Sequence, residues 1–522
     1  MPATFNERPH QNEKTEALAY VRQLMEQARK ESNHEELPKL EKLLELIDSK
    51  RYGLVWEEHA ELVEEEMKTK IPVFVEDETR KIQGNPESED YNFLLEGDNL
   101  HSLHLLQKTH AGKIDVIYID PPYNTGNKDF IYNDKIVDKT DGYSHSKWLS
   151  FMSKRLELAK ELLSETGVIF ISIDDNEQAQ LKLLCDEIFG EDNISATFCV
   201  IRAEGGGMAK QVIKGHEYCF VYAKNISVFT PLAKKKDIRG KVIKKDGIEY
   251  WIQEDWLRKE FGKYGNCHYE EIIEFKGQEF KNEVDKKLDS GEYVLIPKNN
   301  GLNIVGKLRR VDEDSSKFYS IIKHLNKDGI KEVQGIGIDF SYPKPMSLVK
   351  DLVKGATFFS KKGTILDFFA GSGTTGHAVA QLNKEDGGNR KYILCTNNEN
   401  KICEEVTYKR LANIQEELPH NLKYFKTQFI EKEDEELEYS LLNNVKTLIE
   451  LEHAIDLNES GKAVAFSLSE IRALDLTGIK TVYVCQHSHA LMDKNDLVRY
   501  EGIELIDVPE YYFAKEMREA GL

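Results

Sequence analysis

The chain has 522 residues, 40% of them hydrophobic and 31% charged, with a formal net charge of −20 at pH 7. This length predicts about three to five domains, the composition is that of a soluble globular protein, and no apolar run approaches the roughly 20 residues that a membrane helix needs. The negative charge would exclude a nucleic-acid partner only if it were evenly spread, and it is not: acidic residues gather at 56–67 and 431–439 and basic residues at 233–245 and 306–310.

The N-terminal half begins with helical spacing and then changes pattern. The first residues have no apolar core, so we expect a cytoplasmic protein without a signal peptide. Residues 1–90 place Leu, Ile and Val at helical spacing between charges, which predicts an N-terminal helical region. Residues 91–225 alternate amphipathic helices with apolar strands, which we expect at 113–120, 167–174 and 216–225. Apolar strands separated by helices predict a parallel sheet with helices on both faces.

The C-terminal half interrupts this alternation and then resumes it. Residues 226–340 are polar and contain short strand-like pieces, which predicts an inserted α+β domain. Residues 341–430 return to helix, strand "TILDFF", helix and strand, and should complete the sheet. Residues 431–522 begin with an acidic helical stretch and continue with short strands, which predicts a small C-terminal α/β unit. The fold class is therefore α/β.

A glycine loop lies in the second half of this α/β pattern. Gly371, Gly373 and Gly376 follow an expected strand and open an expected helix, the context in which such a loop binds a cofactor. Glu399 ends the next strand, about where a ribose-binding acid belongs. A dinucleotide is allowed, whereas a P-loop is excluded because no Lys-Ser or Lys-Thr follows the glycines. An ordinary tight turn between strand and helix is the alternative.

The second motif is "DPPY", residues 120–123, at the end of an expected parallel strand. Two prolines fix φ and remove two backbone N–H donors. The carboxylate of Asp120 and the carbonyl of Pro121 then form a surface of hydrogen-bond acceptors, with the ring of Tyr123 beside it. This surface suits an exocyclic amino group on a flat base, which offers two N–H donors and can stack on an aromatic ring.

Together the two motifs resemble those of DNA amino-methyltransferases. "DPPYNTG" (120–126) precedes "DFFAGSGTTGHA" (367–378), which is the order of the β class. "YPKPMSLVKDLV" (342–353) resembles the additional cofactor helix of that class. Phrases such as "GVIFISIDDNEQAQLKLLCDEIFG" are similar to Mod subunits of Type III restriction–modification systems. The resemblance is dense over 40–225 and 340–400.

The resemblance implies a Rossmann-like methyltransferase sheet in permuted, β-class order, with the insert as target-recognition domain. It also implies S-adenosyl-L-methionine as cofactor and N6 of a flipped adenine in duplex DNA as methyl acceptor. No metal is implied. The implied catalytic residues are Asp120, Pro121, Pro122 and Tyr123. The implied cofactor-binding residues are Asp98, Lys344, Asp367, Phe368, Ala370, Gly371, Gly373, Thr374 and Glu399.

Several of the implied cofactor contacts have a stated role. The helix that begins near Thr374 would offer N–H groups and a positive dipole end to the cofactor carboxylate, which Lys344 would also approach. Glu399 would take the ribose hydroxyls, and the residues from Asp367 to Gly373 would line the methionyl side. Asp98 would lie near the cofactor's adenine, although "GDN" is also an ordinary helix-cap sequence.

Partners and alternatives complete the prediction. By resemblance, residues 1–90 and 431–522 serve dimerisation to a homodimer or docking of a Res helicase–nuclease subunit. The alternatives are an orphan methyltransferase, cytosine N4 specificity, an RNA or protein amide acceptor, and a DNA-binding specificity subunit that guides a partner nuclease. C5-cytosine methylation is excluded, since no Pro-Cys supplies the nucleophile. "IIEFK" (272–276) resembles a nuclease motif, but we expect core-strand residues followed by a surface lysine.

Overall fold

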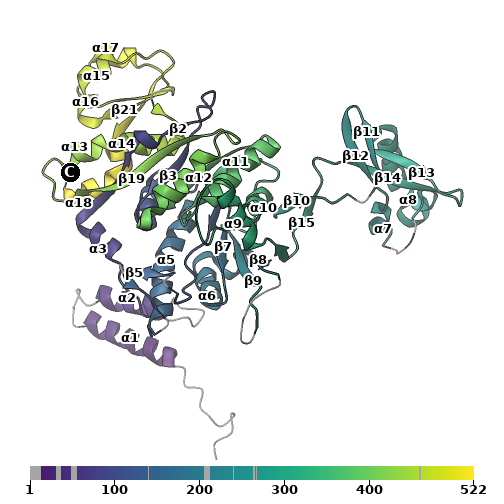
Figure 1. The fold of residues 1–522 in the computed structure, drawn as a ribbon, viewed down its shortest axis with the longest axis horizontal. Coiled ribbons are helices and arrows are strands. Elements are labelled where there is room, and N and C mark those ends of the chain that lie inside the picture. The colour runs from purple at the N-terminus through teal and green to yellow at the C-terminus, as the bar shows by residue number, and fades with distance from the viewer. Residues whose placement is uncertain are drawn as a thin grey trace, which may run out of the picture.

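The computed structural model describes residues 13–30, 37–48 and 56–521, apart from 128, 134, 139, 205–211, 239, 263–264, 266 and 458–459. An 11-stranded sheet forms the centre of the molecule (Figure 1). In sheet order its strands are β1 (Lys70–Glu76), β19 (Asn421–Glu431), β3 (Asn92–Glu96), β18 (Asn389–Thr396), β17 (Lys362–Asp367), β4 (Ile114–Ile119), β7 (Leu163–Ile173), β9 (His216–Ala223), β8 (Ile194–Ile201) and β16 (Ile321–Lys323), with β2 (Ile82–Gln83) beside β19.

The central strands of this sheet run parallel, as the sequence predicts. β19, β3, β18, β17, β4 and β7 pair in parallel, so strands from both halves of the chain interleave in one sheet. The strand expected at 216–225 is present as β9, but it runs antiparallel to both β7 and β8. The expectation of an all-parallel sheet is therefore wrong at this edge. An antiparallel neighbour needs no crossover helix, and a uniform apolar pattern does not show strand direction.

Helices cover both faces of the sheet and enclose two hydrophobic cores. One core is shared by α4 (Asn99–His110), α5 (Ser144–Leu162), α6 (Gln178–Phe189) and α14 (Val445–His453). The other is shared by α10 (Met346–Ala356), α11 (Thr374–Asp386) and α12 (Lys409–Asn413). α9 (Asn326–Gly335), the short pair β5 (Ile131–Tyr132) and β6 (Lys135–Ile136), and a π-helix over Ile402–Tyr408 complete this body.

A separate lobe projects from the main body (Figure 1). β10 (Ala233–Lys235) and β15 (Ser315–Lys317) form the two-stranded connection. The lobe itself is an antiparallel sheet of β11 (Val242–Lys245), β12 (Ile248–Gln253), β14 (Asn303–Arg310) and β13 (Tyr293–Pro297), with α7 (Trp256–Phe261) and α8 (Ile272–Asp289). Residues 272–276 open helix α8, so the core strand expected there is wrong. Of these five residues only Ile272 is buried, and α8 has a kink at Gly277, where φ is 83°. A five-residue window does not fix a period.

The two ends of the described chain carry smaller elements. The helices α1 (Glu13–Lys30), α2 (Leu37–Asp48) and α3 (Leu62–Thr69) precede β1. After β19 come α13 (Leu437–Asn443), the parallel sheet of β20 (Lys462–Ala465), β21 (Thr481–Cys485) and β22 (Glu504–Val508), and the helices α15 (Leu468–Ala473), α16 (Gln486–Ala490), α17 (Lys494–Arg499) and α18 (Glu510–Ala520). Within the described ranges, no helix combines the length and the apolar character needed to cross a membrane.

Candidate active site

The carboxyl ends of β4 and β17 lie side by side at the centre of the sheet. The strands pair in parallel, with Ile365 opposite Val116 and Leu366 opposite Ile117. α5 follows β4 on one face of the sheet, whereas α11 follows β17 on the other face. Open α/β sheets bind their ligands at such a switch point, outside the carboxyl ends of the strands. The fold therefore brings together two motifs that are far apart in the sequence.

The turn after β4 presents hydrogen-bond acceptors. The Trp148 indole donates a 2.7 Å hydrogen bond to the Pro122 carbonyl, whereas no described residue donates one to the Pro121 carbonyl. The Tyr123 hydroxyl donates to Oδ1 of Asp120 at 2.8 Å. The Asp120 side chain keeps 26% of its surface exposed. The turn is thus anchored at Pro122 and leaves acceptors at Asp120 and Pro121.

The Lys344 ammonium lies against this turn. Its Nζ donates to the Tyr123 hydroxyl at 2.6 Å and to Oε1 of Glu217 at 2.5 Å. It lies 3.4 Å from Oδ1 of Asp120. The same nitrogen is 5.0 Å from the Tyr123 ring centroid, so it lies near the hydroxyl edge of the ring. Lys344, expected near the cofactor, is therefore placed among the residues of the catalytic turn.

Burial and charge set the protonation of this cluster. Burial raises the pKa of Asp120, Lys344 lowers it, and the negative charge of Glu217 raises it again. Burial would lower the pKa of Lys344, but the two carboxylates outweigh burial and raise it. Burial and the charge of Asp120 hold the pKa of Tyr123 well above its ordinary value. Lys344 therefore stays a cation and Tyr123 stays a hydrogen-bond donor.

The glycine loop joins β17 to α11. Gly373 is the N-cap residue of α11 and adopts a left-handed backbone, with φ 73°. A Cβ on Gly373 would lie 3.2 Å from Cγ2 of Thr407. The Thr407 hydroxyl in turn donates to the Gly371 carbonyl at 2.6 Å, and the Ala370 amide donates to the Cys395 carbonyl at 3.1 Å. These contacts hold a close turn that only glycine enters without strain.

Asp367 supports the loop from inside. Its two oxygens accept hydrogen bonds from the Phe369 amide at 3.0 Å and from the Thr375 hydroxyl at 2.5 Å. The residue is 3% exposed. Burial raises the pKa of Asp367 to about 7, against the lowering effect of these two hydrogen bonds. The carboxyl group is thus a buried brace between the end of β17 and the first turn of α11.

Arg410 lies beneath the start of α11 and was not predicted from the sequence. Its Nη1 donates to the Thr374 hydroxyl at 2.8 Å and to the Ser372 hydroxyl at 3.2 Å. Thr374 also contacts the backbone carbonyl of Lys344 at 3.4 Å. The Thr374 side chain is therefore taken up by protein contacts, while the first backbone N–H groups of a helix have no acceptor within that helix.

Three other predicted cofactor residues have different surroundings. Asp98 is the N-cap of α4, accepting the Leu100 amide at 2.7 Å, and it also pairs with Arg155 at 3.3 Å. Phe368 is fully buried in the core. Glu399 follows β18 and is exposed. The contacts of Asp98 are those of a helix cap, and the cofactor roles of all three stay predictions.

The residues missed from the sequence share one property. Glu217, Trp148 and Arg410 support the motifs from other elements of the fold. Glu217 is the second residue of β9, whose antiparallel direction brings its first residues to the carboxyl end of β7. A lone acid at the start of an otherwise apolar strand was the available signal. Assigning this acid to the site also requires the direction of the strand, which the sequence does not show.

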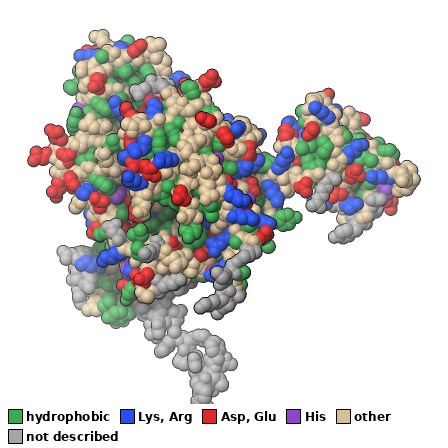
Figure 2. Space-filling view, viewed as in Figure 1, with side chains coloured by type: hydrophobic (Ala, Val, Ile, Leu, Met, Phe, Trp, Pro, Cys, Tyr) green, Lys and Arg blue, Asp and Glu red, His purple; other side chains and the backbone are tan. Residues whose placement is uncertain are grey.

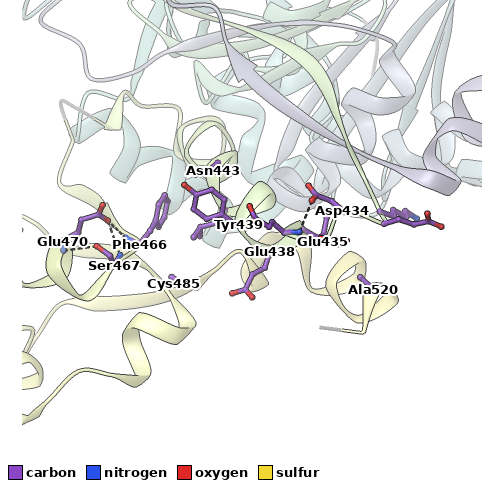
Figure 3. A pocket seen from close by; sticks show the side chains of 15 residues that line it. Asp434, Glu435, Glu438, Tyr439, Asn443, Phe466, Ser467, Glu470, Cys485 and Ala520 are labelled. Carbon is purple, nitrogen blue, oxygen red and sulfur yellow. Dashed lines mark hydrogen bonds between the residues drawn. The ribbon is translucent and has the colours of Figure 1, made fainter.

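A cavity of about 1030 Å³ lies away from this site (Figure 3). It is bounded by the acidic segment around α13 and by residues of the C-terminal unit such as Phe466, Glu470 and Cys485. None of the residues predicted to bind substrate or cofactor lines it. The candidate active site is therefore defined by side-chain chemistry at the strand ends and not by the size of a cavity.

Residues 114–408 match the DNA methylase family, which is more than half of the 522-residue chain. The chain belongs to this family of DNA methylases. The matched range contains both motifs and the lobe. The resemblance predicted from the sequence is confirmed, and so is the α/β sheet with the catalytic strand written before the cofactor strand.

Three relatives illustrate the family. The Mod subunit of the Type III restriction-modification enzyme StyLTI of Salmonella typhimurium is 35% identical over 63% of this chain and 56% of its own length. The EcoPI Mod subunit of Escherichia phage P1 is 32% identical over 68% and 66%. The Type II methyltransferase M.KpnI of Klebsiella pneumoniae is 34% identical over 60% and 82%. The chain thus spans just over half to about two thirds of the length of these two Mod subunits.

Proposed function

We propose that this protein is a site-specific DNA methyltransferase that transfers a methyl group from S-adenosyl-L-methionine to N6 of an adenine flipped out of duplex DNA. The observation that carries the proposal is the turn after β4, whose acceptors adjoin the glycine loop of β17. We further propose that it acts as the modification subunit of a Type III restriction–modification enzyme, as a homodimer, with a Res helicase–nuclease subunit as partner.

The catalytic turn would hold the amino group of the base. An exocyclic amine has two hydrogens, and the turn offers a carboxylate oxygen of Asp120 and the Pro121 carbonyl as two acceptors. Accepting both hydrogens increases the electron density on nitrogen and fixes the direction of its lone pair. The Tyr123 ring would stack on the base. The Trp148 hydrogen bond to Pro122 at 2.7 Å keeps the turn in place while this happens.

The loop residues fit a methionyl cofactor with a carboxylate. Gly373 lets the chain turn close to the ligand, and α11, which begins at Thr374, directs its N-terminal N–H groups to the same side. When bound, S-adenosyl-L-methionine supplies a sulfonium methyl group whose carbon–sulfur bond breaks towards sulfur as nitrogen attacks. The protein's contribution is alignment, because an activated methyl group needs no covalent enzyme intermediate. The proton lost from nitrogen would pass to solvent by way of the Asp120 carboxylate, whose side chain keeps 26% of its surface exposed.

The lobe is the candidate target-recognition domain. It is inserted between the catalytic and cofactor halves, so it could face the DNA beside the flipped base (Figure 1). Figure 2 shows Lys and Arg side chains on this face of the main body, towards the side from which the lobe projects. Cations of this kind contact phosphates, whereas polar side chains read base edges. The N-terminal helices and the C-terminal unit are proposed to serve dimerisation and partner docking.

The test measures methyl transfer directly. Purified protein is incubated with labelled cofactor and duplex DNA, RNA or protein acceptors, and the modified base is identified by mass spectrometry. We expect N6-methyladenine in duplex DNA, and no transfer by an Asp120→Ala variant that still binds cofactor and DNA. N4-methylcytosine would change the acceptor, and equal DNA binding without transfer by the folded, cofactor-bound wild type would refute the enzyme. Methylation of one strand of an asymmetric site supports the Type III assignment.

A further inference from the structure

Glu217 is a buried carboxylate at the active-site edge of the sheet. It is 1% exposed and is the second residue of β9, whose next residue, Tyr218, pairs with Ile173 at the end of β7. Its Oε1 lies 2.5 Å from the Lys344 ammonium, and its Oε2 lies 3.5 Å from the Arg202 guanidinium. Removing a carboxylate from water without partners is costly, so the two cations explain its burial. They do not explain why it faces the catalytic turn.

Lys344 lies between two carboxylates but much closer to one of them. Its nitrogen is 2.5 Å from Glu217 and 3.4 Å from Asp120. Its other short contact is with the Tyr123 hydroxyl, at 2.6 Å. The ammonium therefore makes its two shortest hydrogen bonds with Glu217 and Tyr123 and a longer contact with Asp120. Asp120 receives the hydroxyl hydrogen of Tyr123 instead, and only at Oδ1.

We propose that Glu217 is a positioning residue for methyl transfer, which draws the Lys344 ammonium towards itself, so that the contact with Asp120 stays longer and this carboxylate can accept the substrate amine. The inference rests on the proposed function and names a residue that neither motif contains. Without Glu217, the nearest anion to the ammonium is Asp120. A charged contact between ammonium and carboxylate is stronger than the hydrogen bond that a neutral amine offers, so Lys344 would displace the amine.

The same geometry predicts how the pH dependence changes. The groups facing Asp120 are Tyr118 and Tyr123 from β4 and its turn, Glu217 and Cys219 from β9, Lys344 before α10, and Asp367 from β17, with Arg202 behind Glu217. Glu217 raises the pKa of Asp120 and Lys344 lowers it. Because the ionised carboxylate is the acceptor, activity falls as Asp120 is protonated. Removing Glu217 should therefore move the acid limb of the rate profile to lower pH, and removing Lys344 should move it to higher pH.

The experiment compares Glu217→Gln with a matched control. Asp186→Asn is the control. Like Glu217, Asp186 is buried, contacts a tyrosine hydroxyl (Tyr222 of β9, at 2.6 Å) and pairs with a lysine (Lys182, at 2.5 Å). Unlike Glu217, it lies in α6, outside the site. For Glu217→Gln we expect kcat for DNA methylation to fall roughly 10- to 100-fold, the range of a lost charged hydrogen bond. Affinities for cofactor and DNA should change little, and the acid limb should move down. Asp186→Asn should keep the wild-type kcat and acid limb.

A balanced variant guards against misfolding. Glu217→Gln/Lys344→Gln removes one buried charge of each sign, so it should fold even if Glu217→Gln alone does not. Its acid limb should lie below that of Lys344→Gln, and its kcat should exceed that of Glu217→Gln, because no ammonium remains to occupy Asp120. Glu217→Asp should restore the wild-type acid limb.

Two results would overturn the inference. One is a Glu217→Gln variant that matches Asp186→Asn in kcat. The other is a Glu217→Gln variant with a lower kcat but with the acid limb of the wild type, together with a double variant that has the acid limb of Lys344→Gln. This result would show that Glu217 has only a structural role. A wild-type protein that methylates no acceptor would instead refute the proposed function, so the two failures are distinguishable.

Discussion

Asp367 offers a test of how the site is built, because it is a buried carboxyl group that would be ionised at neutral pH if it were exposed to water. Its pKa rises from 3.8 to about 7, chiefly through burial. A buried acid with a raised pKa stabilises the fold fully below its unfolded pKa, and this stability is lost as pH rises through the folded pKa. The window therefore runs from about pH 4 to about pH 7. Above it, the folded protein carries a buried negative charge.

The perturbation is Asp367→Asn. An amide is neutral at every pH, its oxygen can accept the Phe369 amide, and its nitrogen can donate to the Thr375 hydroxyl, so both contacts of the carboxyl group have a replacement. A shift of roughly three pKa units corresponds to about 4 kcal/mol across the whole window. Between pH 5.5 and 8, the variant should gain roughly 2 kcal/mol in free energy of unfolding relative to the wild type.

The assay is native-state hydrogen exchange followed by mass spectrometry, read on peptides of β17. This local measurement is preferable to a single melting temperature, since a chain of several domains does not unfold in one step. Asp138→Asn is the control, because Asp138 is exposed and hydrogen bonds from Thr140 lower its pKa, so its substitution adds no pH-dependent term above pH 5.5. The reasoning would be refuted if the difference in free energy of unfolding between Asp367→Asn and the wild type stayed constant or shrank from pH 5.5 to pH 8.

Three further substitutions test the loop, the turn and the attachment of the C-terminal unit. Gly373→Ala places a Cβ at φ 73° and 3.2 Å from Thr407, so we expect strain of about 1–2 kcal/mol and weaker cofactor binding by calorimetry; wild-type affinity would contradict this. Trp148→Phe removes the donor to the Pro122 carbonyl, so kcat should fall roughly tenfold with unchanged cofactor affinity, and an unchanged kcat would contradict it. Lys423→Met removes the buried ammonium that lies 2.7 Å from Glu450 of α14 and 3.1 Å from Glu76 of β1. We expect about 3–5 kcal/mol of destabilisation, measured as exchange in β19 and α14; unaltered protection would show that these ion pairs are dispensable.

The two motifs were predictable because each is local. "DPPY" and the glycine loop combine backbone restriction with donor and acceptor chemistry inside a few residues, and the apolar runs on either side identify β4 and β17. Each element needs only its own sequence to be recognised. Their contact then follows from one general rule, that ligands bind at the carboxyl ends of parallel strands.

The supporting residues were not predictable because their positions depend on pairing between distant strands. Glu217 reaches the site only because β9 runs antiparallel to β7, and Trp148 because one turn of α5 packs under the proline turn. The strand expected at 272–276 is wrong because five residues do not fix a period. These residues form the first part of α8, before its kink at Gly277. Phe368 and its neighbour Phe369 look equivalent in sequence, yet only Phe368 is fully buried.

The position of Lys344 explains why the two halves of the chain must fold as one site. Lys344 lies on the segment that returns from the lobe, two residues before α10 begins at Met346. The backbone of this segment packs against Gly329 of α9, where a Cβ would lie 2.7 Å from the Pro343 carbonyl. Its side chain then crosses to Tyr123 and Glu217 in the first half of the chain. The candidate catalytic cluster is therefore completed by a residue that follows the lobe in the chain.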